Sequence, residues 1–312
     1  MRPLIIIRRI PNIDFMGLRH IGFALSGLMT IASIVLFFVN GLNYGIDFSG
    51  GTIIEVRSLS GAADLGKMRA DLDSLGLRDV TLQNFGGPDN VLIRLQEQSD
   101  KTQEQTVNQV KAKLGNAFEY RRTEVVGPTV GAELIKAGVE ATVLALFAIA
   151  VYVWFRFEWP FGVGAMLSTV HDTITTIGLF SLLQIEFNLT TLAAILTIAG
   201  YSINDTVVIY DRVRETMRRY KTMDFAELIN KSLNETLSRT ILTVSTTALA
   251  VLSLLLFGGE VLRGFSIAML WGIVVGTYSS LFIAAPLLFY IRPKRAAVQS
   301  GDAGEVAARG KP

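Results

Sequence analysis

The chain has 312 residues, 50% of them hydrophobic, and its mean hydropathy of +0.43 is too apolar for an ordinary soluble protein. Its 29 basic and 27 acidic side chains leave a net charge of +2, so we expect no nucleic-acid partner. The sequence contains no cysteine, which excludes disulfides and thiolate metal sites.

Six runs of apolar residues are long enough to cross a membrane, which takes about 20 residues of helix. They lie near 20–39, 134–155, 161–183, 189–210, 238–257 and 265–290. The first run is too long for a cleavable signal peptide and is followed by no small-x-small cleavage site. The sequence therefore predicts an α-helical polytopic membrane protein with six transmembrane helices. The first belongs to residues 1–40 and the other five form a bundle within 133–290.

Basic side chains in the short connections indicate the orientation. They lie before the first span, after the second, after the fourth and after the sixth, whereas the opposite short connections, 184–188 and 258–264, hold only Arg263. Lysine and arginine accumulate in cytoplasmic loops, so both termini are predicted to be cytoplasmic.

Two further cytoplasmic segments follow from this topology. Residues 211–237 would connect the fourth and fifth spans. Within them, 222–236 has the spacing of a short amphipathic helix along the membrane surface, with Asp224 as its N-cap. This helix is either a solvated connector or a partner contact. The tail, 291–312, is small and polar and is predicted to be disordered.

One connection, residues 41–132, is long enough to form an extracytoplasmic domain with its own core. Its apolar periodicity and turn signals give the order strand, helix, strand, strand, helix, strand. This βαββαβ order is that of a ferredoxin-like α+β domain. The predicted elements are 51–58, 63–77, 80–86, 90–96, 102–115 and 118–126.

Polar residues inside the spans are candidates for function, because a charge in the bilayer costs several kcal/mol. The fourth span carries Asn204 and Asp205, and the third carries His171 and Asp172 near its centre. Arg239 opens the fifth span at a similar depth to Asp205. A membrane aspartate with a movable arginine partner could take up and release protons, so these five residues form a candidate proton relay.

Structural explanations remain open for the same residues. The acids could join helices through interhelical hydrogen bonds, and Arg239 could extend to the membrane interface. Asp211 is expected at the exit of the fourth span, paired with Arg212 or Arg214.

Four motifs resemble the SecF family of bacterial protein export. They are YGIDFSGGTIIEV at 44–56, VVGPTVGAEL at 125–134, HD at 171–172 and GYSINDTVVIYDRVRE at 200–215. The resemblance extends from about residue 15 to 295. It implies membership of the resistance-nodulation-division superfamily of proton-driven transporters, and a place in the bacterial inner membrane.

The resemblance also implies partners and roles. The expected partners are SecD, forming SecDF, then the SecYEG channel, SecA, YidC, a translocating preprotein and membrane lipid. With SecD, such a protein is expected to use the proton motive force to complete preprotein translocation, without a cofactor or a metal. Asp205 and Arg239 match the family's functional aspartate and arginine.

The outer motifs are candidates for coupling the bundle to the outer domain. Asp47, Gly50 and Gly51 lie where the chain leaves the first span, and Gly127 and Pro128 lie where it enters the second. Glycine permits turns that other residues make only at a cost, and proline stiffens the return. A hinge and a plain loop boundary are both compatible with this pattern.

Three other functions are weighed against protein export. A half-size subunit of a proton-coupled exporter of small molecules is the main alternative, although such exporters usually carry about twice as many spans in one chain. A membrane enzyme is not expected, because the GxGD, HExxH and GxSxG patterns are absent from the sequence. A pure scaffold would leave Asp205 and Arg239 without a task.

Overall fold

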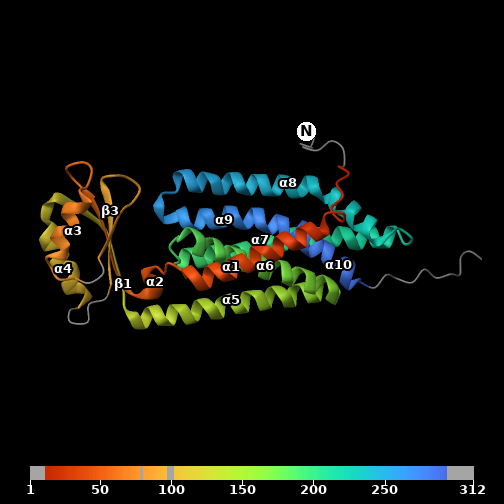
Figure 1. Cartoon of the computed structure of the whole chain (residues 1–312), viewed down its shortest axis with the longest axis horizontal. Coiled ribbons are helices and arrows are strands. Elements are labelled where there is room, and N and C mark those ends of the chain that lie inside the picture. Colours follow the sequence, from red (N-terminus) through yellow and green to blue (C-terminus); the bar gives the residue numbers. More distant parts are fainter. Residues whose placement is uncertain (1–10, 78–79, 97–101, 294–312) are drawn as a thin grey trace, which may run out of the picture.

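The computed structural model describes residues 11–77, 80–96 and 102–293, and shows a helical bundle with a small sheet domain at one end (Figure 1). Six helices are long and apolar enough to span a membrane, which confirms the predicted fold class. Most of the tail predicted to be disordered lies outside the described residues. The spans are formed by α1 (Arg19–Asn40), α5 (Pro128–Arg156), α6 (Trp159–Leu183), α7 (Leu189–Arg219), α8 (Phe225–Phe257), and α9 (Glu260–Ser279) continued by η2 (Ser280–Ala284) and α10 (Ala285–Ile291).

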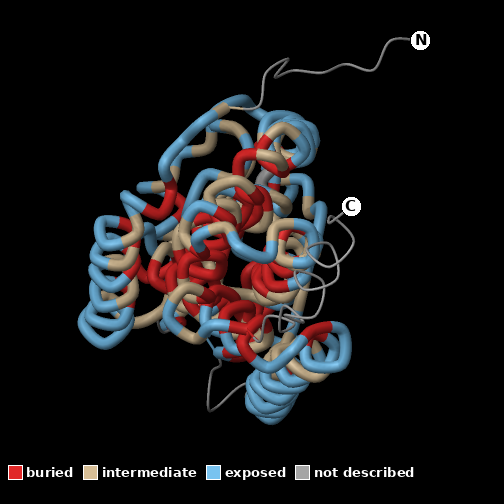
Figure 2. The backbone as a smooth tube through the Cα atoms, turned by 90° about the vertical axis from the view of Figure 1, so that its right-hand side faces the viewer, coloured by how far each residue is buried: buried red, intermediate tan, exposed pale blue. Residues whose placement is uncertain are grey.

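The bundle has a buried centre and a peripheral ring, as the view along its length shows (Figure 2). In their most apolar windows, α6 is 56% buried, α7 44% and the last span 61%. By contrast, α5 is only 6% buried and α8 11%. The outer faces of α5 and α8 are therefore available to lipid or to another membrane protein.

Small residues let the central helices approach closely. A Cβ atom added at Gly178 on α6 would collide with Ser33 of α1, including its backbone. One added at Gly272 on α9 would collide with the side chain of Ile198 on α7. Dispersion contacts dominate helix association in lipid, so these short separations contribute directly to the stability of the bundle.

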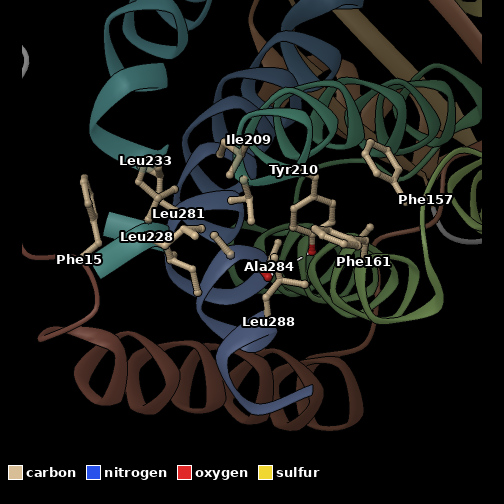
Figure 3. Close-up of a cluster of buried hydrophobic side chains, with 14 of the residues drawn as sticks. Phe15, Phe157, Phe161, Ile209, Tyr210, Leu228, Leu233, Leu281, Ala284 and Leu288 are labelled. Atoms are coloured by element: carbon tan, nitrogen blue, oxygen red, sulfur yellow. Dashed lines mark hydrogen bonds between the residues drawn. The ribbon is translucent and has the colours of Figure 1, made fainter. Parts of the chain in front are cut away.

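The end of the bundle away from the sheet is closed by a large apolar cluster (Figure 3). Tyr210 of α7 packs edge-on against Phe161 of α6, with ring centroids 5.0 Å apart, and its hydroxyl donates to the Ala284 carbonyl at 3.1 Å. From α8, Leu228 and Leu233 are fully buried in the same cluster. The start of α8 is thus part of the core.

The predicted connector 211–237 is consequently almost entirely helical. α7 continues to Arg219, α8 starts at Phe225, and only 220–224 lie between them. The amphipathic stretch at 222–236 is not a separate surface helix, because its apolar face packs into the bundle and its helix runs on into the fifth span. The predicted N-cap is confirmed. Asp224 accepts from the Ala226 and Glu227 amides, and these bonds hold the pKa of its carboxyl below the usual range.

The outer domain has the predicted ferredoxin-like topology. Its sheet is antiparallel, in the order β2-β3-β1-β4, and α3 and α4 lie on one face. Ile54 and Ile93 are fully buried beneath Leu72 of α3 and Val110 of α4. The elements are β1 (Gly51–Ser58), α3 (Leu65–Asp73), β2 (Thr81–Asn84), β3 (Asn90–Leu95), α4 (Gln103–Leu114) and β4 (Phe118–Val126), with a short 3-10 turn η1 (Gly115–Ala117) before β4.

Gly51 is required where the chain enters this sheet. Its φ is +122°, and a Cβ atom there would lie 2.5 Å from the Leu95 carbonyl oxygen of the neighbouring strand. Gly61 has a comparable φ of +101° but open space around it. A residue with a Cβ atom would be strained by the backbone conformation at either position. Only at Gly51 would its Cβ atom also collide with the neighbouring strand.

We expect Gly51→Ala to destabilise the outer domain by about 3 kcal/mol, because strain and overpacking add, and Gly61→Ala by about 1 kcal/mol from strain alone. Hydrogen exchange of the β1 and β3 amides in the full-length protein measures the difference. Equal exchange rates in the two variants would contradict the importance of the close approach.

Candidate functional site

The most deeply buried polar group in the candidate relay is Asp172, which belongs to α6 and is fully buried. One of its oxygens accepts hydrogen bonds from Ser202 of α7 at 2.6 Å and from Ser279 of α9 at 2.8 Å. The other oxygen lies 3.0 Å from Nδ1 of its neighbour His171. Buried carboxylates need such partners, so this cluster ties three central helices together.

Only one of the two ring nitrogens of His171 has a hydrogen-bond partner among the described residues. Its Nε2 is buried and, among the described residues, has no hydrogen-bond partner. The imidazole lies beside the Tyr278 ring of α9, with centroids 6.4 Å apart. The ring is therefore held by Asp172 on one side and by packing on the other.

Asp205 forms a second site at the boundary of α7 and α8. Its Oδ1 accepts a hydrogen bond from the Thr240 hydroxyl of α8 at 2.7 Å, whereas its Oδ2 is buried and, within the described chain, has no hydrogen-bond partner. Arg239 precedes Thr240 and is exposed. It lies near enough for its charge to act on the carboxylate, but the described residues contain no ion pair between the two within 4 Å.

The five residues of the candidate relay thus fall into separate groups. His171 and Asp172 are buried between α6, α7 and α9, whereas Asp205 faces α8 at the edge of the central helices. Asn204 is exposed and does not share the environment of Asp205.

Two hydroxyls that sequence reasoning missed are the chain neighbours of residues in these groups, since Thr206 follows Asp205 and Ser280 follows Ser279. Thr206 of α7 and Ser280 of the last span are hydrogen-bonded at 2.8 Å and fully buried. Ser280 is the first residue of η2, a π-helical turn. Its hydroxyl bonds to Thr206 of α7, and the neighbouring Ser279 bonds to the same Asp172 oxygen as Ser202 of α7. The adjacent serines and Pro286 within an apolar run were the available signal, because proline and π-turns interrupt regular helices, often at functional sites.

The prediction for Asp211 was wrong in its partner. Both oxygens of Asp211 accept from the guanidinium of Arg156, at the end of α5, at 2.8 Å. Arg212 instead pairs with Glu215 and Glu235. Because α7 continues about two turns past Asp211, this residue is not at the helix exit and reaches across to α5.

At the opposite end, the outer motif contacts the start of α7. Asp47 lies in a short helix, α2 (Ile46–Ser49), which sequence analysis treated as a loop. Its carboxylate accepts a hydrogen bond from the backbone amide of Leu189, the first residue of α7, at 2.9 Å. A negative side chain at this position satisfies a free amide and complements the helix dipole.

Three further contacts strengthen this junction. Phe187, in the loop between α6 and α7, pairs by backbone hydrogen bonds with Asn43 and Gly45, and its ring stacks on Phe48 at 5.5 Å. The neighbouring Glu186 forms an ion pair with Arg94 of β3. The loop that starts α7 is thus held by both α2 and the sheet.

Of the other coupling residues, Gly50 ends α2 and Gly51 starts β1, both with positive φ. Gly127 is extended, and α5 begins directly after it at Pro128. One turn further, a Cβ atom at Gly131 would lie 2.9 Å from the Phe48 carbonyl oxygen. The chain therefore leaves the bundle for the sheet, and returns from the sheet to the bundle, at the same junction.

Two family models match the chain. The model described as protein export membrane protein SecD/SecF, C-terminal, matches residues 106–294, and the SecD/SecF GG motif model matches residues 35–58, which include Gly50 and Gly51. The first covers more than half of the chain. The chain belongs to the SecD/SecF family of protein export membrane proteins.

Relatives in this family are similar over almost their whole length. The protein translocase subunit SecF of Rickettsia felis is 48% identical over 289 residues, which are 90% of this chain and 94% of the relative. That of Rickettsia bellii strain OSU 85-389 is 46% identical over 296 residues, or 93% and 97%.

Solved structures of SecDF are also similar to this chain. That of SecDF from Thermus thermophilus, a translocon-associated membrane protein, matches 91% of the chain with a TM-score of 0.81 at 37% identity. SecDF in a super-membrane-facing form matches 96% with a TM-score of 0.68 at 36% identity. The chain spans only 39% and 40% of these two SecDF chains.

We expect Asp172→Ala to lower the free energy of unfolding by about 3 kcal/mol, because it leaves the buried Ser202 hydroxyl and the His171 imidazole without their hydrogen-bond partner. Thermal unfolding of the purified protein in detergent measures the loss. Thr246→Ala is the control, since that exposed hydroxyl bonds only within α8. In the Asp172→Ala background, Ser202→Ala should cost little more. If the costs of Asp172→Ala and Ser202→Ala were additive, the hydrogen bond between the two side chains would not contribute to stability, and the cluster would be contradicted.

We expect Asp47→Ala to weaken the first turn of α7 by about 1 kcal/mol, the usual effect of losing a side-chain acceptor at a helix start. Hydrogen exchange should accelerate at residues 189–192 and stay unchanged at 205–210. Asp64→Ala is the matched control, because the carboxylate of Asp64 also accepts hydrogen bonds from backbone amides at a helix start, that of α3. Faster exchange at 189–192 in the control would refute a local role for Asp47.

Proposed function

We propose that this chain is a subunit of a bacterial inner-membrane protein-export complex that pairs with a SecD-type partner and uses the proton gradient to complete preprotein translocation. Its SecF relatives are named protein translocase subunits, and the chain corresponds to about two fifths of the SecDF proteins. Family membership favours a polypeptide over the small-molecule cargo of the alternative exporter.

The observation that carries the proposal is the environment of Asp205. Its carboxylate is placed within an apolar bundle at a cost of several kcal/mol. One of its oxygens is bound by Thr240 and the other has no partner in the described part of the chain, so the second oxygen is a place where a proton can bind. An acid used only to join helices would be expected to have both oxygens satisfied, as Asp172 has.

The helix that covers Asp205 is weakly held. Only 11% of the apolar window of α8 is buried, although its first turns are anchored in the apolar cluster. Thr240 and Arg239 both belong to α8. A shift of this helix would therefore change the positions of the hydroxyl and of the cation near the carboxylate at the same time. Proton binding at Asp205 and the position of α8 are coupled in this mechanism.

The junction around Asp47 provides a route to the outer domain. Asp205 and the first residue of α7 are 16 positions apart, or about 24 Å along the helix axis. Because Leu189 is held by Asp47 and the adjacent loop by Arg94, a displacement of α7 reaches the sheet directly.

The remaining parts of the proposal concern topology and partners. The basic side chains near the ends of α5 and α7 support a cytoplasmic location for that end of the bundle and for both termini, with the sheet domain in the periplasm. A SecD-type bundle would cover part of the exposed faces of α5 and α8. SecYEG, SecA and YidC remain the expected neighbours, from the family resemblance.

The test is preprotein translocation into vesicles that contain the purified complex, with the proton gradient intact or collapsed. Asp205→Asn keeps the size of the side chain but cannot titrate, so we expect the gradient-dependent part of translocation to fall by at least about tenfold. The part that persists after collapse should be unchanged. Arg239→Met should act in the same direction.

Glu140→Gln is the matched control, because Glu140 is also an acid within a span but is exposed on α5 and paired with Lys136. It should leave both parts of translocation at the parental level. Parental gradient-dependent translocation in an assembled Asp205→Asn complex would overturn the proposal.

A further inference from the structure

An open pocket of about 510 Å³ lies at the end of the bundle away from the sheet. It is formed where the end of α5 meets the last turns of α7. Four arginines and two acids line it: Arg156, Arg214, Arg218, Arg219, Asp211 and Glu215. Neither the proposed translocation mechanism nor the family comparison gives this pocket a task.

The two acids of the pocket are already neutralised. Asp211 accepts from Arg156 through both oxygens, and Glu215 pairs with Arg212, which does not line the pocket. Within residues 11–77, 80–96 and 102–293, Arg214 and Arg218 have no carboxylate within 4 Å. The pocket therefore presents uncompensated positive charge.

An aromatic ring holds part of that charge in place. Phe157, buried between α5 and α6, has the Arg156 guanidinium 4.8 Å from its ring centroid and that of Arg214 at 5.3 Å. Arg214 also donates to the Arg156 carbonyl at 3.4 Å. Figure 3 shows Phe157 beside Tyr210 at the edge of the apolar cluster, so the ring itself is firmly packed. This preorganises the guanidinium of Arg214 for an anion.

Large exposed aromatics lie close to Arg156 in the chain. On the last turn of α5, Trp154 is 71% exposed and Phe155 90% exposed, and Trp159 at the start of α6 is 58% exposed. Tryptophan is enriched at the level of lipid headgroups, and exposed phenylalanine in a span faces acyl chains. Arg156 of the pocket directly follows Trp154 and Phe155 in the chain, so the pocket is close to the level expected for lipid headgroups.

We propose that this pocket binds the phosphate of an anionic phospholipid, with Arg214 and Arg218 contacting the phosphate and Trp154 and Phe155 packing on the acyl chains. Basic pockets between helices on the cytoplasmic side are suited to such headgroups. An acidic segment of a partner protein would also contact the arginines, but it would not account for the exposed aromatics close by in the chain. The geometry therefore favours the lipid.

The experiment is lipid binding to the purified full chain in detergent, counted by native mass spectrometry. The probes are phosphatidylglycerol, zwitterionic phosphatidylcholine, inorganic phosphate and an acidic peptide. We expect phosphatidylglycerol to bind more tightly than phosphatidylcholine, and inorganic phosphate at millimolar concentration not to displace it. The double variant Arg214→Gln with Arg218→Gln should bind phosphatidylglycerol about tenfold more weakly.

The control removes the same charge at the same end of the bundle but outside the pocket, by Lys221→Gln with Arg292→Gln. It should change phosphatidylglycerol binding by less than about twofold. An equal loss in both double variants would mean general surface attraction and overturn the site. Displacement by inorganic phosphate would assign it to free phosphate, and arginine-dependent binding of an acidic peptide without lipid binding would assign it to protein. Each of these results refutes the lipid proposal.

Discussion

The hydrogen bonding of one buried carboxylate constrains the whole bundle. Asp172 has no access to solvent, so its oxygens must be satisfied by Ser202, Ser279 and its neighbour His171. These partners come from three helices, and their bonds form only at one rotation and depth of each helix. The close contacts at Gly178 and Gly272 agree with that arrangement. The central helices therefore have a specific mutual position that apolar packing alone would leave less defined.

The peripheral helix α8 is held differently. Its first turns are buried in the apolar cluster, whereas its long apolar part meets the centre through few buried residues and, at Asp205, through one hydroxyl. Asp172, in the centre, has partners for both oxygens, whereas Asp205, at the edge, has a partner for only one among the described residues. This difference fits a rigid set of central helices and a peripheral helix α8 that can shift. Opening of weakly buried elements requires less free energy than rearrangement of a packed core.

Hydropathy and periodicity were sufficient for the six spans and for the order of elements in the outer domain, because both depend on which residues avoid water. They were insufficient for contacts between distant segments. The partner of Asp211 depends on α7 continuing past the predicted span, which brings it to Arg156. Ser279 and Ser280 are hydroxyls in an apolar run, so nothing periodic marks them. The partner of Asp47 is the first residue of α7, 142 positions away in the sequence.

Most of the polar features meet on α7. Its first residue is bound by Asp47, its middle carries Asp205, and its last turns carry the pocket arginines. With 31 residues it is about 46 Å long, whereas the apolar core of a bilayer is about 30 Å thick. Both ends of α7 therefore reach beyond the hydrocarbon while Asp205, 16 positions from the start, lies near its midpoint. α7 is held at its start by Asp47 and near its end by the Arg156–Asp211 ion pair, so in the proposed mechanism a charge change at Asp205 would move α7 together with the central helices. In the same mechanism, the Asp47 and Arg94 contacts would transmit such a movement to the outer domain.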